Sequence, residues 1–454
     1  MLSKYGFKVP SGSAGRLALG WFLLGVLSLL LAGLLALSLV LSRMPMVQEY
    51  VPFLNDFHVL LVVHVDLSVL IWFISFAGVF WCIASTDKIM WLGWTALFFS
   101  SLGTILIALC PFVGASNPLM NNYIPVLNDS LFLTGLFIFA FGFTLHITWA
   151  LLTIRPFSGF LTGEGILRYG SYMGAITAAL SLVAFIWSYL QAPLSYEPHP
   201  YYEVLFWGSG HILQFVHTIM MLVAWLWLVS LANINVKLGP KLLIVLFTSF
   251  PVVSLVGLFT YPFFDVTTSA HREIFTIVMQ YGMGLPVVII AAYVVAGVFY
   301  SDDYENKGIK YLKSAIISSL GLFIAGGVIG YLIKGVNVTI PAHYHGVIVG
   351  VTIAFMGLSY YLLPALGFRT PKGKIVELQP YIYGGGQLLS IIGLTIAGGY
   401  GVQRKVAGVV QGLDSFKKIF SMGLMGIGGV IAIIGGILFL VILLYSMRPS
   451  KKLT

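Results

Sequence analysis

The stretch Pro341-Ala342-His343-Tyr344-His345-Gly346 places two histidines two residues apart at the start of the apolar run VIVGVTIAFMG (347–357). On an α-helix, residues i and i+2 point about 200° apart. Two imidazoles arranged in this way cannot bind the same metal ion, but each can bind a cofactor on its own side of the helix. The other interpretation is a pair of histidines solvated at the end of a membrane helix.

The composition indicates an integral membrane protein. Of the 454 residues, 59% are hydrophobic and 9% are charged, whereas soluble domains carry about 25% charged residues. The net charge of +9 does not indicate nucleic-acid binding, because the basic residues lie in short loops between apolar segments. Cys82 and Cys110 both lie inside apolar segments, so a bound metal is expected to have nitrogen or oxygen ligands.

Apolar stretches of 18 or more residues predict transmembrane helices. The sequence contains twelve of them, at about 15–42, 58–84, 89–113, 127–154, 169–190, 204–234, 241–264, 272–299, 311–334, 343–364, 379–399 and 418–446. We therefore predict an all-α integral membrane protein of twelve transmembrane helices, forming a single polytopic domain over residues 1–454. No convincing internal repeat is present, which disfavours a transporter built from inverted repeats.

The distribution of basic residues predicts the orientation in the membrane. With the N-terminus in the cytoplasm, 17 of the 24 Lys and Arg residues lie on the cytoplasmic side. The positive-inside rule therefore places both termini in the cytoplasm. Four of the seven other basic residues share one predicted outer loop: Arg404, Lys405, Lys417 and Lys418. This cluster needs an explanation of its own.

Six of the nine histidines share one predicted depth on the outer side. They are His58, His64, His211, His271, His343 and His345. Ionisable groups at membrane depth are costly and usually functional, although histidines also gather at helix ends by chance. Imidazoles without thiolates suit haem iron, and a low-spin haem takes two axial histidines. His64 and His345 are the predicted pair, and His343 is predicted to bind a second haem with a free sixth position.

Five motifs together resemble subunit I of the haem-copper oxidase superfamily, the catalytic subunit of cytochrome c oxidases and nitric oxide reductases. PAHYHGVIVG (341–350) resembles the family's tenth-helix motif, and VVHVDLSVLIWF (62–73) resembles its second-helix motif. Three further segments resemble the family around helix four, around helix six and between helices eleven and twelve: NYIPVLNDSLFLTGLFIF (122–139), FWGSGHILQFVHT (206–218) and QRKVAG (403–408). The resemblance implies the same haem ligands, and it implies that Arg404 and Lys405 bind haem propionates.

The sequence departs from this family at the copper site. His211 takes the place of the helix-six copper ligand, but Tyr261 and Pro262 stand where the family has an adjacent histidine pair. The nearest histidine is His271, which is single. A copper ion bound by three imidazoles is therefore doubtful. A weaker site formed by His211, His271 and an oxygen ligand is the remaining alternative.

The resemblance implies an oxidoreductase of the terminal oxidase or nitric oxide reductase type, in which electrons pass from the low-spin to the high-spin haem for reduction of O2 or NO. A two-haem electron conduit or gas-binding protein without copper is the alternative, and a transporter or structural subunit is the third. The sequence shows no cupredoxin or cytochrome c segment. The resemblance therefore implies a separate electron-donating subunit of one of these types, in the inner membrane of a prokaryote.

Overall fold

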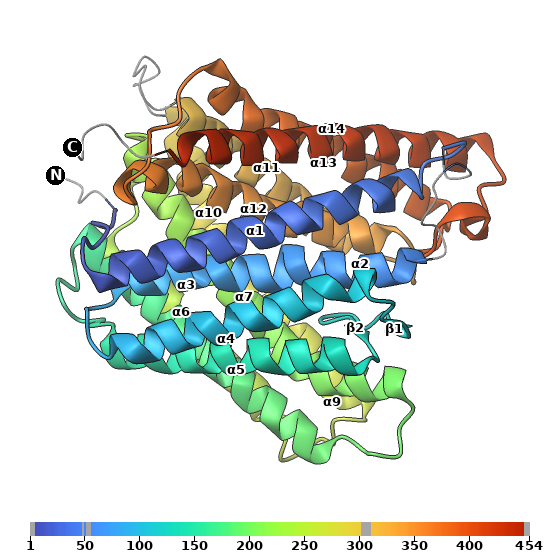
Figure 1. Cartoon of the computed structure of the whole chain (residues 1–454), viewed down its shortest axis with the longest axis horizontal. Coiled ribbons are helices and arrows are strands. Elements are labelled where there is room, and N and C mark those ends of the chain that lie inside the picture. The colour runs from blue at the N-terminus through green and yellow to red at the C-terminus, as the bar shows by residue number, and fades with distance from the viewer. Residues whose placement is uncertain (1–4, 48–49, 51–55, 301–309, 449–454) are drawn as a thin grey trace. The chain divides into compact units, whose positions relative to one another are not determined.

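The computed structural model describes residues 5–47, 50, 56–300 and 310–448. Twelve helices in this part of the chain are long and apolar enough to cross a membrane, which confirms the predicted all-α architecture (Figure 1). The ends of the chain, residues 1–4 and 449–454, lie outside the described residues, and their predicted cytoplasmic location stays a prediction.

The chain divides into two compact units, each of which is described separately. Unit 1 comprises Met1–Ser28 and Leu70–Tyr304, and unit 2 comprises Leu29–Val69 and Glu305–Thr454. Two spans therefore contribute residues to both units. They are α1 (Ser13–Leu41) and the second span, which is built from α2 (Phe57–Val65), the π-helical turn η3 (Asp66–Ile71) and α3 (Trp72–Ala84).

Unit 1 is organised around α7, whose most apolar window is 94% buried. A helix that is hydrophobic on all sides is expected in the interior, and α7 packs against α6, α8 and α3. The other elements of unit 1, in chain order, are α4 (Met90–Leu109), η4 (Cys110–Phe112), β1 (Pro118–Leu119), β2 (Val126–Leu127), α5 (Ser130–Thr153), α6 (Gly163–Gln191), α7 (Pro198–Leu231), α8 (Pro240–Leu258), α9 (Ser269–Ile277), η5 (Val278–Met283) and α10 (Gly284–Tyr300).

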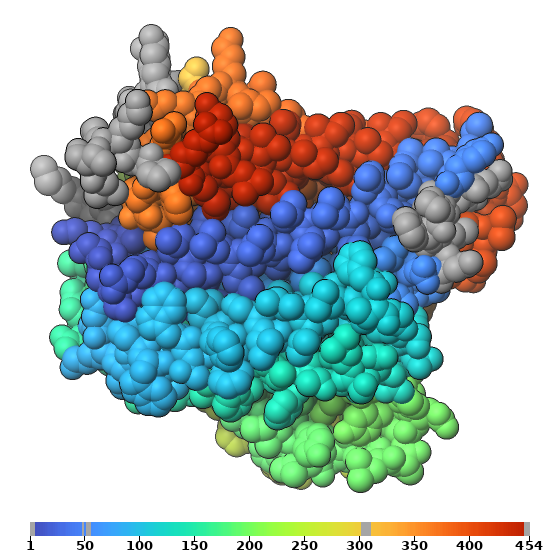
Figure 2. Space-filling model, in the orientation of Figure 1, coloured from blue at the N-terminus to red at the C-terminus, as the bar shows by residue number. Residues whose placement is uncertain are grey.

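Unit 2 is built mainly from four long helices that pack on one another through small residues. Its elements beyond those already named are α11 (Lys310–Tyr331), α12 (Thr339–Ala365), α13 (Lys374–Gly399), η6 (Gly408–Gln411) and α14 (Phe416–Ser446). In α12 the most apolar window is 83% buried, against 44% in α14. Figure 2 shows α14 along the surface, where Ile427, Ile434 and Val441 are exposed, as expected for a helix that contacts lipid.

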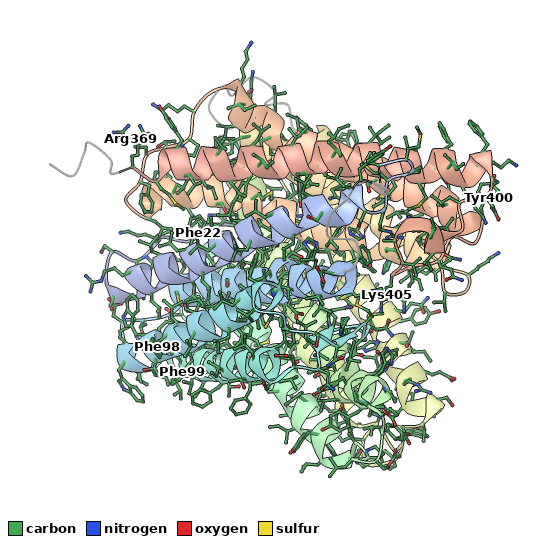
Figure 3. All side chains as sticks on the ribbon, turned by 45° about the vertical axis from the view of Figure 1, so that its right-hand side comes forward. Phe22, Phe98, Phe99, Arg369, Tyr400 and Lys405 are labelled. Atoms are coloured by element: carbon green, nitrogen blue, oxygen red, sulfur yellow. The ribbon has the colours of Figure 1, made fainter. Side chains whose placement is uncertain are left out.

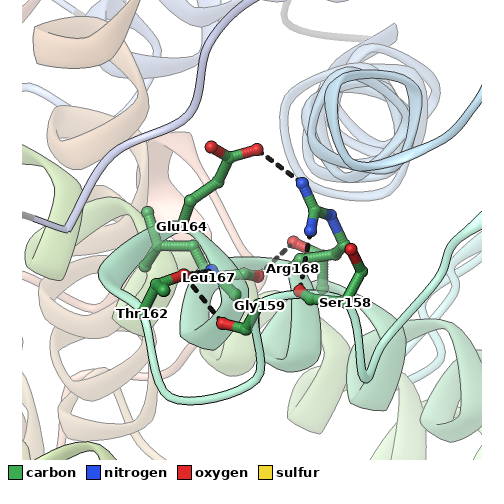
Figure 4. A network of polar contacts seen from close by, with 8 residues as sticks. Ser158, Gly159, Thr162, Glu164, Leu167 and Arg168 are labelled. Atoms are coloured by element: carbon green, nitrogen blue, oxygen red, sulfur yellow. Dashed lines mark hydrogen bonds and ion pairs between the residues drawn. The ribbon is translucent and has the colours of Figure 1, made fainter.

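Helix α6 begins at Gly163, six residues before the predicted span, because a polar turn extends it. The Thr162 hydroxyl accepts from the backbone N–H of Gly165 at 3.0 Å and caps the helix. Glu164 pairs with Arg168 one turn later, and the Arg168 guanidinium also donates to the Ser158 carbonyl at 2.9 Å (Figure 4). Counting apolar residues misses such a turn, because its stability comes from capping and charge pairing.

The segment between α4 and α5 contains an antiparallel hairpin that the sequence did not predict. Pro118 lies opposite Leu127, and Leu119 lies opposite Val126. The strands are too short for an alternating hydrophobic pattern to be recognised.

Candidate cofactor site

His64 lies near the C-terminal end of α2, and a contact with α1 fixes its ring. Its Nδ1 is 2.9 Å from the Ala32 carbonyl oxygen. Because a carbonyl oxygen only accepts, Nδ1 carries the proton and Nε2 keeps a lone pair. Within the described part of the chain no hydrogen bond reaches this Nε2. The ring is therefore oriented in the way that metal-binding histidines are oriented by a partner behind them.

His345 has the same arrangement within its own helix. Its Nδ1 lies 2.7 Å from the Pro341 carbonyl oxygen, one turn earlier, and the Tyr344 ring stacks beside it at a centroid distance of 4.9 Å. His345 interacts electrostatically with His64 and Arg43. Unit 2 thus brings together the two residues that the sequence predicts as ligands of the low-spin haem.

His343 points to a different neighbour. Its Nδ1 lies 2.7 Å from the Gly326 carbonyl oxygen of α11, so its Nε2 also keeps a lone pair. Gly330, one turn further along α11, leaves room for the ring, since a Cβ there would lie 2.8 Å from Nδ1. His343 therefore faces α11 while His345 faces His64, as two positions of helix spacing i and i+2 require.

The histidine pair does not open its helix as predicted. α12 begins at Thr339, four residues before the predicted start at 343, so both histidines lie in the second turn. The earlier start has a chemical consequence, because it places the Pro341 carbonyl where it can accept from His345.

The predicted propionate-binding residues, Arg404 and Lys405, lie in the loop between α13 and α14. Figure 3 shows Tyr400 where α13 terminates, and Lys405 farther along the loop, beside the end of α2 that carries His58. Arg404 interacts electrostatically with Tyr344, the residue between the two histidines. The basic loop therefore lies close to the predicted ligand helix.

Arg43 lies beside the candidate site, although none of the motifs includes it. It follows α1 and interacts with Tyr344. Its Nε and Nη2 are buried and have no hydrogen-bond partner among the described residues. Burial lowers the pKa of Arg43, and Tyr344 opposes that effect. An arginine stays charged, and leaving its buried N–H groups without hydrogen bonds is costly, so this position favours an anionic group of a ligand.

In the sequence, Arg43 is distinguished only as one of the seven basic residues on the predicted outer side. That count was the one available signal, because no motif surrounds the residue and its burial depends on packing.

In unit 1, His211 is hydrogen-bonded at both ring nitrogens. Its Nδ1 lies 2.7 Å from the Trp207 carbonyl oxygen, and its Nε2 lies 2.7 Å from the Tyr123 hydroxyl. Since Nδ1 donates to the carbonyl, Nε2 accepts from the tyrosine. Burial raises the pKa of Tyr123, and the Glu203 carboxylate raises it further. The phenol therefore stays neutral and continues to donate.

The β1–β2 hairpin delivers Tyr123 to this position. Beside it, the backbone and side-chain amides of Asn122 both donate to the carboxylate of Glu203, in the first turns of α7. Gly210 leaves room for the tyrosine, because a Cβ there would overlap the Tyr123 ring. The Tyr123 and His211 rings are 4.5 Å apart between centroids. Several independent contacts thus hold the tyrosine against His211.

Tyr261 lies in the turn after α8, because this helix ends at Leu258 rather than at the predicted residue 264. Its hydroxyl lies 2.8 Å from the Ser188 hydroxyl of α6, and its ring packs edge-on against His271 with centroids 4.7 Å apart. Burial raises the pKa of Tyr261 to about 12, although the hydrogen bond from Ser188 opposes the shift. Its phenol is therefore neutral and directed to α6.

These residues do not fit a copper ion bound by imidazoles. His211 and His271 lie close enough to interact electrostatically, but the Nε2 of His211 already accepts from Tyr123. Over the described ranges, no cluster of three or more His, Cys, Asp or Glu side chains could hold a metal ion.

Comparisons with known proteins place the chain in a family. Residues 16–445 match the family described as Cytochrome C and Quinol oxidase polypeptide I. An uncharacterized protein of Rickettsia prowazekii, RP382, is 32% identical over 94% of this chain and 95% of its own length. An uncharacterized protein of Aquifex aeolicus is 26% identical over 80% of this chain and 88% of its own length.

A solved structure of a haem-copper terminal oxidase dimer has a similar fold. The TM-score is 0.78 at 20% identity, and the match covers 97% of this chain and 85% of that one. This likeness shows a shared fold, and the family match over residues 16–445 shows that the chain belongs to the cytochrome c and quinol oxidase polypeptide I family.

Proposed function

We propose that this chain is the haem-binding subunit of a respiratory membrane protein, in which electrons pass from a low-spin haem on His64 and His345 to a high-spin haem on His343 for reduction of O2 or NO. Membership of the family implies haem cofactors. One observation carries the residue assignment. All three histidines donate Nδ1–H to a backbone carbonyl, which orients each ring and leaves Nε2 for iron.

The surrounding residues support binding of the haem carboxylates. The Nε and Nη2 of Arg43 are buried and have no hydrogen-bond partner among the described residues, and this guanidinium interacts with the same tyrosine as Arg404. We propose that Arg43, Arg404 and Lys405 together bind the propionates of the low-spin haem. A haem in this position would supply one-electron redox chemistry. His64 and His345 would bind its iron, and the three basic residues would neutralise its carboxylates.

The test is the absorption spectrum of purified protein and three alanine variants. We expect the reduced wild type to show a low-spin haem and a high-spin haem that binds CO. His64→Ala and His345→Ala should each abolish the low-spin signal, because a low-spin haem needs both axial nitrogens. His343→Ala should abolish CO binding and keep the low-spin signal. Wild-type protein without haem would overturn the proposal, and loss of the low-spin haem from His343→Ala would reverse the assignment within the pair.

A second function is favoured by the contact between Tyr123 and His211. If no copper binds beside the second haem, the protein is a two-haem electron conduit or a gas-binding protein without oxidase activity. Metal analysis and O2 consumption separate the two functions. For the conduit, we expect haem iron without copper, and no O2 consumption from reduced cytochrome c or a quinol. One copper per chain together with rapid O2 consumption would exclude the conduit and support the oxidase.

The chain is a multi-pass membrane protein with bacterial relatives. We propose that it lies in the inner membrane of a prokaryote and receives electrons from a separate subunit that carries a cupredoxin or c-type cytochrome domain. Mild detergent extraction followed by identification of co-purifying chains tests this partner, and a chain that accepts electrons when purified alone would contradict it.

A further inference from the structure

The loop after α13 is fastened to the same elements that carry the proposed low-spin haem site. The Val402 carbonyl accepts from the Val338 N–H beside α12 at 3.0 Å, and the Gly408 N–H donates to the Ser42 carbonyl beside Arg43 at 3.3 Å. Between these two backbone contacts lie Arg404 and Lys405.

A third contact joins this loop to α2. The Nε2 of His58 lies 2.9 Å from the Lys405 carbonyl oxygen, across 347 residues of sequence. A carbonyl oxygen accepts, so Nε2 carries the proton and donates. His58 stands in the first turn of the helix that also carries His64. Of these three contacts of the loop, the bond from His58 is the one made by a side chain. It can therefore be removed by substitution without changing the backbone.

The peptide that His58 holds has an unusual conformation. Lys405 has φ +60°, a left-handed backbone conformation that residues other than glycine rarely adopt. Such a conformation is strained and persists only when the surroundings fix it. The hydrogen bond from His58 to the carbonyl of that same residue restrains the peptide plane that follows Lys405, and so it restrains the backbone segment that carries Arg404 and Lys405.

We propose that His58 is a positioning residue for the low-spin haem, which holds the Arg404–Lys405 segment against the helix that carries His64. The inference rests on the proposed function, because it takes the two cations as partners of the haem carboxylates. With His58 in place, the Arg404–Lys405 segment stays attached to α2, the helix that carries the proposed iron ligand His64. Without it, the cations can retreat from the carboxylates, and the oxidised, more positively charged haem is then favoured.

The test compares His58→Ala, His58→Gln and the control His199→Ala, which removes another exposed histidine in unit 1. Redox titration of the low-spin bands gives the midpoint potential. We expect His58→Ala to lower this potential and to make it more sensitive to ionic strength. His58→Gln, whose amide can still donate, should restore the wild-type value, and His199→Ala should leave it unchanged. CO binding at the second haem checks that each variant is folded.

The outcomes separate this inference from the proposed function. Loss of the low-spin haem from His58→Ala with recovery in His58→Gln supports the positioning role as well as a shifted potential does. An unchanged potential in His58→Ala, or an equal shift in both His58 variants, overturns the positioning role and leaves the haem assignment standing. A wild type that holds no low-spin haem overturns both.

Discussion

At the scale of single residues, the three proposed haem ligands differ in what holds them. His64 donates to α1, His345 to its own helix and His343 to α11. The carbonyl of Pro341 moves with His345, whereas Gly326 and Ala32 belong to neighbouring helices. The orientation of His343 and His64 therefore depends on helix packing. Substitutions on α11 or α1 should change haem binding even though they leave the proposed ligands unaltered.

Gly330 provides a direct test of this dependence. A Cβ at Gly330 would lie 2.8 Å from the Nδ1 of His343, closer than real contacts allow, so the ring must turn and its bond to Gly326 must weaken. We expect Gly330→Ala to reduce CO binding at the high-spin haem at least several-fold and to leave the low-spin spectrum unchanged. Flash photolysis of the CO adduct measures the effect.

The matched control is Gly327→Ala on the same helix, where an added Cβ meets nothing within 4 Å. CO binding in this variant should equal that of the wild type. Equal behaviour of the two variants would show that the position of α11 does not determine the orientation of His343.

At the scale of elements, α13 and α14 approach so closely that their backbones touch at glycines. A Cβ at Gly386 would lie 2.8 Å from the Gly428 carbonyl oxygen, and one at Gly393 would contact the backbone near Met425. Small residues allow membrane helices to approach in this way, since van der Waals packing rather than hydrophobic burial drives their association. The loop with Arg404 and Lys405 connects these two helices, so their packing determines where it begins and ends.

Adjacent glycines in α13 separate this packing effect from helix propensity. We expect Gly386→Ala to destabilise the protein by about 1–3 kcal/mol, because the backbone of α14 must move. Gly385→Ala should be neutral or stabilising by up to about 1 kcal/mol, since alanine favours a helix and nothing lies within 4 Å of the added Cβ. Thermal denaturation in detergent compares the two variants with the wild type. A larger loss for Gly385→Ala would contradict close packing of α13 and α14.

At the scale of the whole molecule, the predicted orientation places the Arg404–Lys405 loop outside the cell. Two positions in this protein allow the orientation to be measured. Val409 is 86% exposed in the same loop, and Lys372 is exposed in the segment between α12 and α13. Both native cysteines are buried, so the wild type provides an unreactive background.

We expect Val409→Cys to react with a membrane-impermeant maleimide in intact spheroplasts, and Lys372→Cys to react only after permeabilisation. The physical reason is the excess of basic residues in the predicted cytoplasmic loops. Labelling of Lys372→Cys in intact spheroplasts would reverse the topology and place the proposed haem layer on the cytoplasmic side.

The sequence by itself determined the twelve membrane helices and the likeness to the oxidase family. The hydropathy of a membrane span depends on about twenty consecutive residues, so it can be calculated without knowing which helices pack against that span. The same holds for the spacing between His343 and His345, because helical periodicity sets their directions. Span ends were less accurate, since the polar turn around Glu164 and the early start of α12 depend on capping and on local hydrogen bonds.

The tertiary structure alone decided what surrounds the histidines. Tyr123 reaches His211 across 88 residues, from a hairpin whose strands are too short to predict, and it fits there because of Gly210. The burial of Arg43 and the bond from His58 to Lys405 likewise join segments that are distant in sequence. Such contacts depend on how helices pack rather than on any local pattern, which is why the sequence could predict candidate ligands and only the fold showed which neighbours contact each histidine ring.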